Sequence, residues 1–167
     1  MATSGERAWA DNPYGKALGD ADVMVALGET PGILRELVDR LTPAQMASSY
    51  APGKWTAAQL LTHMAQCECV YGDRVRMALA QDGYIVQPFD QDAWLHREAQ
   101  TDGWVAFRAY DAARQMNLSL FRSLTDGERA KVLYHPERGE MHVEWILEIL
   151  AGHERHHLAH FQTIGAC

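Results

Sequence analysis

The chain has 167 residues, 47% of them hydrophobic, which is enough to bury the core of one domain. Its formal net charge is -7 and its lysines and arginines are scattered, so we expect no nucleic-acid partner. It has no apolar run of membrane-spanning length, no signal-peptide pattern, and three cysteines without framework spacing, so we expect no membrane contact and a cytoplasmic location.

The N-terminal part of the chain is predicted to be an arm followed by the first helices. Residues 1–18 have little periodicity and are expected to form the arm, and residues 19–167 are expected to form one helical domain. A short helix is predicted over residues 20–27. The next helix is predicted to begin with Thr30 as its N-cap and Pro31 at its first position.

Three more long helices are predicted in the rest of the chain. Thr56 is predicted to cap a helix that ends near residue 82. Residues 84–102 are polar and are expected to cross over the molecule or cover a site, and further long helices are expected over residues 103–124 and 141–163. No segment with a strand period competes with the helices. The sequence therefore predicts an all-α four-helix bundle.

Four of the eight histidines lie in residues 153–160, inside the last predicted helix. His153 and His157 are four residues apart, so they lie one above the other and can offer two imidazoles to one metal ion. On a helical wheel the apolar stripe centres close to His157 and includes His153, whereas His156 falls outside it and His160 lies at its edge. A buried imidazole needs a partner, so the pattern favours a metal site, with satisfied core histidines as the alternative.

The same run matches the zincin pattern H-E-x-x-H, from His153 through Glu154 to His157. In such proteases the glutamate is a general base and a third ligand follows downstream. Here the extended pattern would place glycine where His160 stands, and Glu154 is expected to be a solvated polar residue. A metalloprotease is therefore the least favoured hypothesis.

The third ligand is expected to be His63, which lies on an apolar face of the helix that begins at Thr56. Three histidines without an evident fourth ligand describe an open site of the catalytic kind. Cys67, one turn away, either approaches the open position or is a small core residue. Three further histidines lie in or near turns and are expected to face solvent, namely His96, His135 and His142.

Two side chains are candidates for contacts with a small-molecule substrate. Arg74 lies near the His63 face and is a candidate for holding an anionic group, with a salt bridge at the rim as the alternative. Trp94, in the crossover, is a candidate for lining a pocket, with a place in the core as the alternative.

Two segments of the chain resemble the DinB-like (DinB/YfiT) superfamily. Residues 50–68 are similar to its Trp-Ser/Thr…His-Leu…Glu segment, and residues 149–158 are similar to the segment with its second and third ligands. The resemblance implies an up-down-down-up bundle with a long crossover between its second and third helices. It also implies a metal ion, often zinc or nickel, held by His63, His153 and His157, and a possible homodimer.

The resemblance leaves the activity open between a thiol and water as nucleophile. The favoured function is a thiol-dependent S-transferase in which the metal activates a low-molecular-weight thiol such as mycothiol or bacillithiol. The alternatives are a metal-dependent hydrolase and a non-catalytic metal-binding protein of the stress response. The sequence has no Ser-His-Asp arrangement and no Gly-rich phosphate loop, so no catalytic residue is assigned beyond the metal-bound thiol or water.

Overall fold

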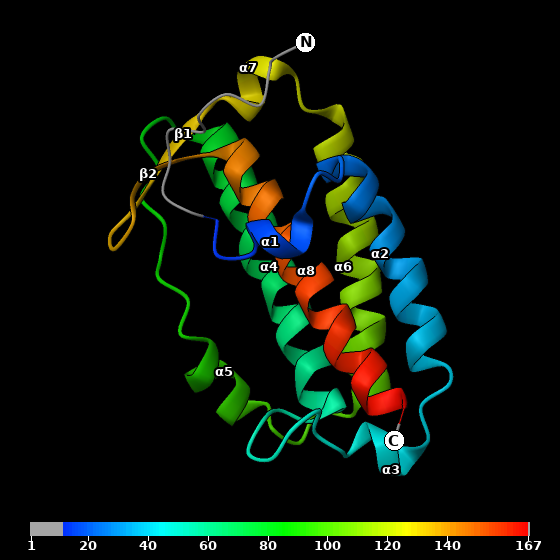
Figure 1. The fold of residues 1–167 in the computed structure, drawn as a ribbon. Helices are drawn as coiled ribbons and strands as arrows, with labels where there is room; N and C mark the ends of the chain where they lie inside the picture. The colour runs from blue at the N-terminus through cyan, green and yellow to red at the C-terminus, as the bar shows by residue number, and fades with distance from the viewer. Residues whose placement is uncertain (1–11, 167) are drawn as a thin grey trace.

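The computed structural model describes residues 12–166, which form a bundle of four long helices (Figure 1). The long helices are α2 (Val23–Val38), α4 (Ala57–Ala80), α6 (Gly103–Ser123) and α8 (Val143–Gly165). Helices α2 and α8 run in one direction and α4 and α6 in the other, and α8 packs against both α2 and α4. The predicted up-down-down-up bundle is confirmed.

Shorter elements lie in the connections between the long helices. They are α1 (Gly15–Leu18), α3 (Pro43–Met46), α5 (Gln91–Arg97), α7 (Asp126–Arg129), β1 (Val132–His135) and β2 (Gly139–His142). Helix α1 packs on α8, and the connection that contains α5 runs along one side of the bundle (Figure 1). The predicted arm lies partly in residues 1–11, outside the described residues.

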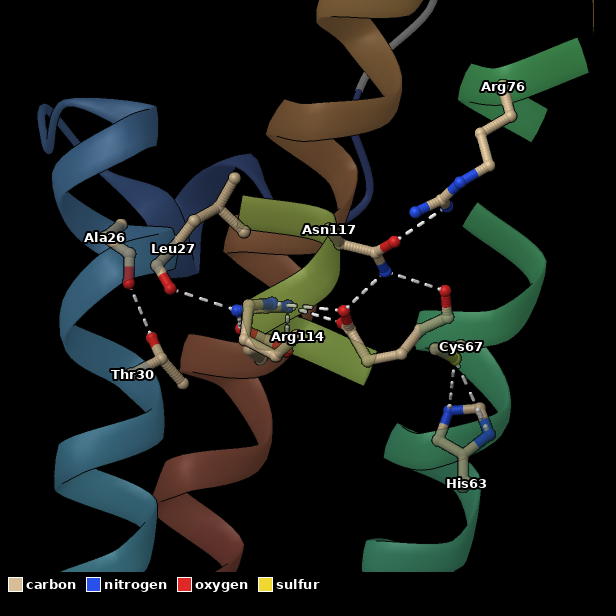
Figure 2. A network of polar contacts seen from close by, with 10 residues as sticks. Ala26, Leu27, Thr30, His63, Cys67, Arg76, Arg114 and Asn117 are labelled. Atoms are coloured by element: carbon tan, nitrogen blue, oxygen red, sulfur yellow. Dashed lines mark hydrogen bonds and ion pairs between the residues drawn. The ribbon is translucent and has the colours of Figure 1, made fainter. Parts of the chain in front are cut away.

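One helix, α2, replaces the two that were predicted around Thr30. The Thr30 hydroxyl does not cap a helix but donates to the Ala26 carbonyl at 2.8 Å, within the same helix. Pro31 has no N–H, so it cannot bond the Leu27 carbonyl four residues earlier. That carbonyl accepts a hydrogen bond of 3.1 Å from Arg114 Nη1 instead (Figure 2). The helix continues because a side chain from α6 satisfies the acceptor that the proline leaves.

A short hairpin, β1 and β2, precedes α8 and was not among the predicted elements, although the all-α class holds. The strands pair antiparallel with Leu133 opposite Met141, and these two side chains are buried. Gly139 has a φ of 78°, a conformation that favours glycine. Four-residue strands are too short to show a clear alternation of apolar and polar residues, so the sequence did not reveal them. The last helix begins after the hairpin, at Val143, slightly later than predicted.

Apolar side chains form two clusters along the bundle. One contains Leu27, Val75, Phe121 and Ile146, and the other contains Leu34, Leu60, Phe107 and Phe161. Each long helix also carries buried polar side chains, among them Thr30 on α2, His63 and Glu68 on α4, Arg114 and Asn117 on α6, and His153, Glu154 and His157 on α8.

Gly152 allows the N-terminal segment to approach α8. A Cβ atom at this position would lie 2.7 Å from the Tyr14 carbonyl oxygen and 2.9 Å from the Tyr14 Cβ. A Gly152→Ala change must displace Tyr14, so we expect the free energy of unfolding to fall by about 1–3 kcal/mol in a urea titration. Gly127→Ala is the control, because nothing lies within 4 Å of a Cβ added there. Equal stability of the two variants would contradict this account.

Candidate metal centre

Helices α4 and α8 bring three histidine side chains to one point. Helix α4 begins where predicted, because Thr56 and Gln59 form a reciprocal capping box, and this helix carries His63 on its buried face. His153 and His157 lie one turn apart on the buried face of α8. The Nε2 atom of His153 lies 2.9 Å from the Nε2 atom of His63 and 2.9 Å from that of His157.

The three facing nitrogens are chemically suited to a cation. One ring N–H can form a hydrogen bond across only one pair of facing nitrogens. His153 Nε2 faces both His63 Nε2 and His157 Nε2, so a single proton cannot satisfy both contacts. His153 Nδ1 is buried and has no hydrogen-bond partner among the described residues. Imidazole nitrogens bind zinc at about 2.0–2.1 Å, so nitrogens this close can share one ion.

Burial keeps these imidazoles in the form that binds metals. Desolvation lowers the pKa of His63 to about 4. Desolvation, followed by the neighbouring His63 and His156, lowers the pKa of His153 to about 3. Burial, followed by the neighbouring His153 and His63, lowers the pKa of His157. Neutral imidazole has a free lone pair, so the site is ready for a metal ion without first losing protons.

Cys67 lies beside the three histidines. Its Sγ atom is 3.6 Å from His63 Nε2 (Figure 2). The ligand atoms of His63, Cys67 and His153 lie within 4.8 Å of one another. The thiol is buried, and burial raises its pKa well above the usual value. The side chain therefore both packs in the apolar cluster and approaches the metal centre, so both interpretations of its position have support.

His160 contacts the outer nitrogen of His157. The two Nδ1 atoms lie 3.1 Å apart, and the His160 ring stacks on Tyr50 with 3.8 Å between centroids. A contact of this kind fixes the orientation of a ligating imidazole. His156 is exposed, as expected from the helical wheel. Among the turn histidines, His96 is exposed but His135 is buried, which corrects the expectation that it faces solvent.

Behind the histidines, Arg114 joins two buried carboxylates. Its Nε donates to Glu68 Oε2 at 3.1 Å and its Nη1 donates to Glu154 Oε2 at 2.7 Å. Asn117 also donates to Glu68, at 2.9 Å (Figure 2). Glu68 adjoins Cys67 in the chain and Glu154 adjoins His153, so this ion-pair cluster links α6 to both helices that carry the histidines.

The prediction that Glu154 is solvated is wrong, because only 1% of this side chain is exposed. Its carboxylate forms an ion pair with Arg114, which lies 40 residues earlier in the chain. Sequence periodicity gives no signal for such a pairing. Neither Glu68 nor Arg114 was identified as part of the centre.

A cavity of about 530 Å³ lies along the seam between α4 and α8, and the three histidines do not line it themselves. On α4 it is lined by Tyr71, one turn beyond Cys67, and on α8 by Ile149, one turn before His153. Two rings at its edge contact the centre. Tyr14 packs edge-on against His153 with 5.0 Å between centroids, and Phe89 stacks with His63 at 6.3 Å.

Arg74 lines this cavity and is buried. No carboxylate of residues 12–166 forms an ion pair with it, which does not support the alternative of a rim salt bridge. Trp94 is 45% exposed and lies elsewhere, in a smaller cavity of about 250 Å³ that shares Arg74 and Phe89 with the larger one. Trp94 is therefore not part of the core.

Comparison with known proteins places the chain among bacterial relatives. The model of a family described as the DinB superfamily matches residues 26–161. A protein of Oceanobacillus iheyensis is 26% identical over 81% of this chain and 80% of its own length, and YfiT of Bacillus subtilis is 29% identical over 83% of this chain and 79% of its own. The names of both propose a metal-dependent hydrolase.

A solved structure has the same fold. The structure of YfiT from Bacillus subtilis, described as a probable metal-dependent hydrolase with an unusual four-helix bundle topology, superposes with a TM-score of 0.81 at 22% identity. The match covers 98% of this chain and 92% of that one. Within residues 12–166, no helix is both long and apolar enough to span a membrane.

Proposed function

This chain belongs to the DinB superfamily, and we propose that it is a metal-dependent hydrolase whose single divalent ion is held by His63, His153 and His157. The observation that carries the proposal is the convergence of three buried Nε2 atoms from two helices. The names of the relatives support hydrolysis rather than thiol transfer as the first function to test.

Each part of the centre has a task in this proposal. The bound ion supplies Lewis acidity, which lowers the pKa of a coordinated nucleophile, either water or a thiol, toward neutrality. The three imidazoles hold the ion, and His160 orients His157 through its outer nitrogen. The Tyr14 and Phe89 rings pack on the ligands and restrict solvent access from the side of the cavity.

Among residues 12–166, no side chain at this centre is a strong nucleophile. Burial raises the pKa of the Cys67 thiol in the metal-free protein, which disfavours its thiolate. Glu154, the glutamate of the H-E-x-x-H run, is paired with Arg114 and is directed into α6 rather than toward the histidines. A zincin-type general base at this position is therefore not supported, and the proposal relies on the ion for activation.

The test compares the two nucleophiles on one preparation. The protein is loaded with zinc or nickel, because both ions bind imidazole ligands well. It is then assayed for hydrolysis of a panel of esters and amides. It is also assayed for consumption of a low-molecular-weight thiol with an electrophile panel. We expect hydrolysis that is lost on removing the metal with dipicolinate and restored by adding it back.

The other outcomes identify the other functions. Thiol consumption without hydrolysis would replace the hydrolase with the S-transferase. Full metal occupancy with no turnover in either panel would favour a non-catalytic metal-binding role. Equal hydrolysis before and after removal of the metal would overturn the proposal itself.

A further inference from the structure

Three basic side chains line the cavity beside the metal centre. Arg74 comes from α4, and His135 and Arg138 come from the hairpin. Arg74 is 7% exposed, and its Nη2 donates to the Gln87 carbonyl at 3.0 Å. Arg138 is exposed and lies over the Trp145 ring, 5.9 Å from its centroid. The cavity therefore has guanidinium groups from two separate segments of the chain.

The cavity lining carries two arginines and two carboxylates, Asp90 and Glu137. Burial lowers the pKa of His135, Arg74 lowers it further, Glu137 raises it and Arg138 lowers it, so these charges act on the same space. Asp90 accepts the Ala93 N–H at 2.9 Å as the cap of α5, and no carboxylate of residues 12–166 forms an ion pair with Arg74 or Arg138.

The cavity also has an apolar wall. Met141, Trp145 and Ile149 line it, and Ile149 lies one turn before His153 on α8. On α4, Arg74 lies seven residues beyond Cys67, which is a distance of about 10 Å along the helix axis. The lining also includes Tyr14 and Phe89, whose rings contact His153 and His63, so a molecule held by the arginines reaches the metal centre past these two rings.

We propose that this cavity binds the substrate by a carboxylate, which Arg74 and Arg138 hold while the reacting group lies at the metal centre. The inference rests on the proposed metal-dependent function and adds a substrate class, namely small monoanionic molecules with an apolar body. A guanidinium donates two parallel hydrogen bonds to a carboxylate. A single negative charge suits a cavity whose lining also includes Asp90 and Glu137.

The probe is suberic acid monohydroxamate, measured by calorimetry on zinc-loaded protein. Its hydroxamate chelates zinc and its carboxylate lies at the far end of an apolar chain. The methyl ester of the same compound is the uncharged control. We expect the acid to bind about tenfold more tightly than the ester, as one charge-assisted contact would give.

Two variants locate the effect. Arg138→Gln, on the exposed turn of the hairpin, should remove most of the preference for the acid and leave the affinity of the ester unchanged. Arg74→Gln should do the same, although loss of a buried side chain can also affect folding. Arg108→Gln is the matched control, because Arg108 is exposed on α6 and does not line the cavity. It should retain the full preference.

The outcomes separate this inference from the proposed function. Equal affinities of acid and ester in the unchanged protein would overturn the carboxylate site, as would an undiminished preference in Arg138→Gln. If neither hydroxamate binds, the open metal site fails, and the cavity is tested on metal-free protein with hexanoate against hexanol. Tighter binding of hexanoate that is lost in Arg138→Gln would support the carboxylate site, and no preference would overturn it.

Discussion

Replacing His157 with alanine should lower the affinity for zinc by at least about 100-fold, because it removes one of three ligands from an open site. The measurement is a competition titration with a chromophoric chelator, together with elemental analysis of the purified variant. His156→Ala is the matched control. His156 immediately precedes His157 on the same helix, but it is exposed, so we expect the His156→Ala change to leave the affinity for zinc unchanged.

A second histidine grouping makes the comparison sharper. His156, His157 and His160 also have ligand atoms within 4.8 Å of one another. If the ion were bound there, His156→Ala would weaken binding and His63→Ala would not. We expect the reverse, because His63 Nε2 faces the buried pair on α8 and His156 lies at the surface. Equal losses from the changes at His156 and His157 would show that the ligand set is wrong.

Replacing Arg114 with methionine should destabilise the fold by about 3–5 kcal/mol, because it leaves Glu68 and Glu154 buried without a countercharge. The Leu27 carbonyl also loses its donor. The free energy of unfolding is measured by urea titration of metal-free protein, so that any change in metal binding does not contribute. Arg108→Met on the same helix is the control and should change it by less than about 0.5 kcal/mol.

A combined variant tests whether uncompensated charge is the cause. Adding Glu68→Gln and Glu154→Gln to Arg114→Met removes both carboxylates and should recover part of the lost stability. If the combined variant were less stable than Arg114→Met alone, the loss would come from packing around the guanidinium rather than from charge. If Arg114→Met were as stable as the control variant, the ion-pair cluster would not matter for stability.

The sequence predicted the features that depend on local periodicity. Apolar spacing on the last helix identified the inward face, and the structure places both His153 and His157 on it. The capping signal at Thr56 located the start of α4 and therefore the turn of this helix on which His63 lies. These predictions succeed because the helix fixes which residues share a face, whatever the rest of the chain does.

The features that the sequence missed depend on contacts between distant segments. Glu154 looked solvated because its countercharge, Arg114, comes from another helix. Pro31 suggested a helix start, yet the same arginine satisfies the carbonyl that the proline leaves unbonded. His135 looked exposed because its hairpin was not predicted. In each case a contact with a distant segment of the chain outweighs the local preference. Such a contact cannot be identified from a single sequence.

The parallel arrangement of α4 and α6 has a consequence for how this molecule can change. Parallel neighbours require the chain to return along the whole bundle, and the return path places Phe89 against His63 and Pro88, Asp90 and Gln91 along the cavity. The ligand spacing is set by helix periodicity, whereas this wall belongs to the connection between α4 and α6. Insertions or exchanges in the return path would resize the cavity without altering the metal ligands, so the topology makes selectivity and metal chemistry separately adjustable.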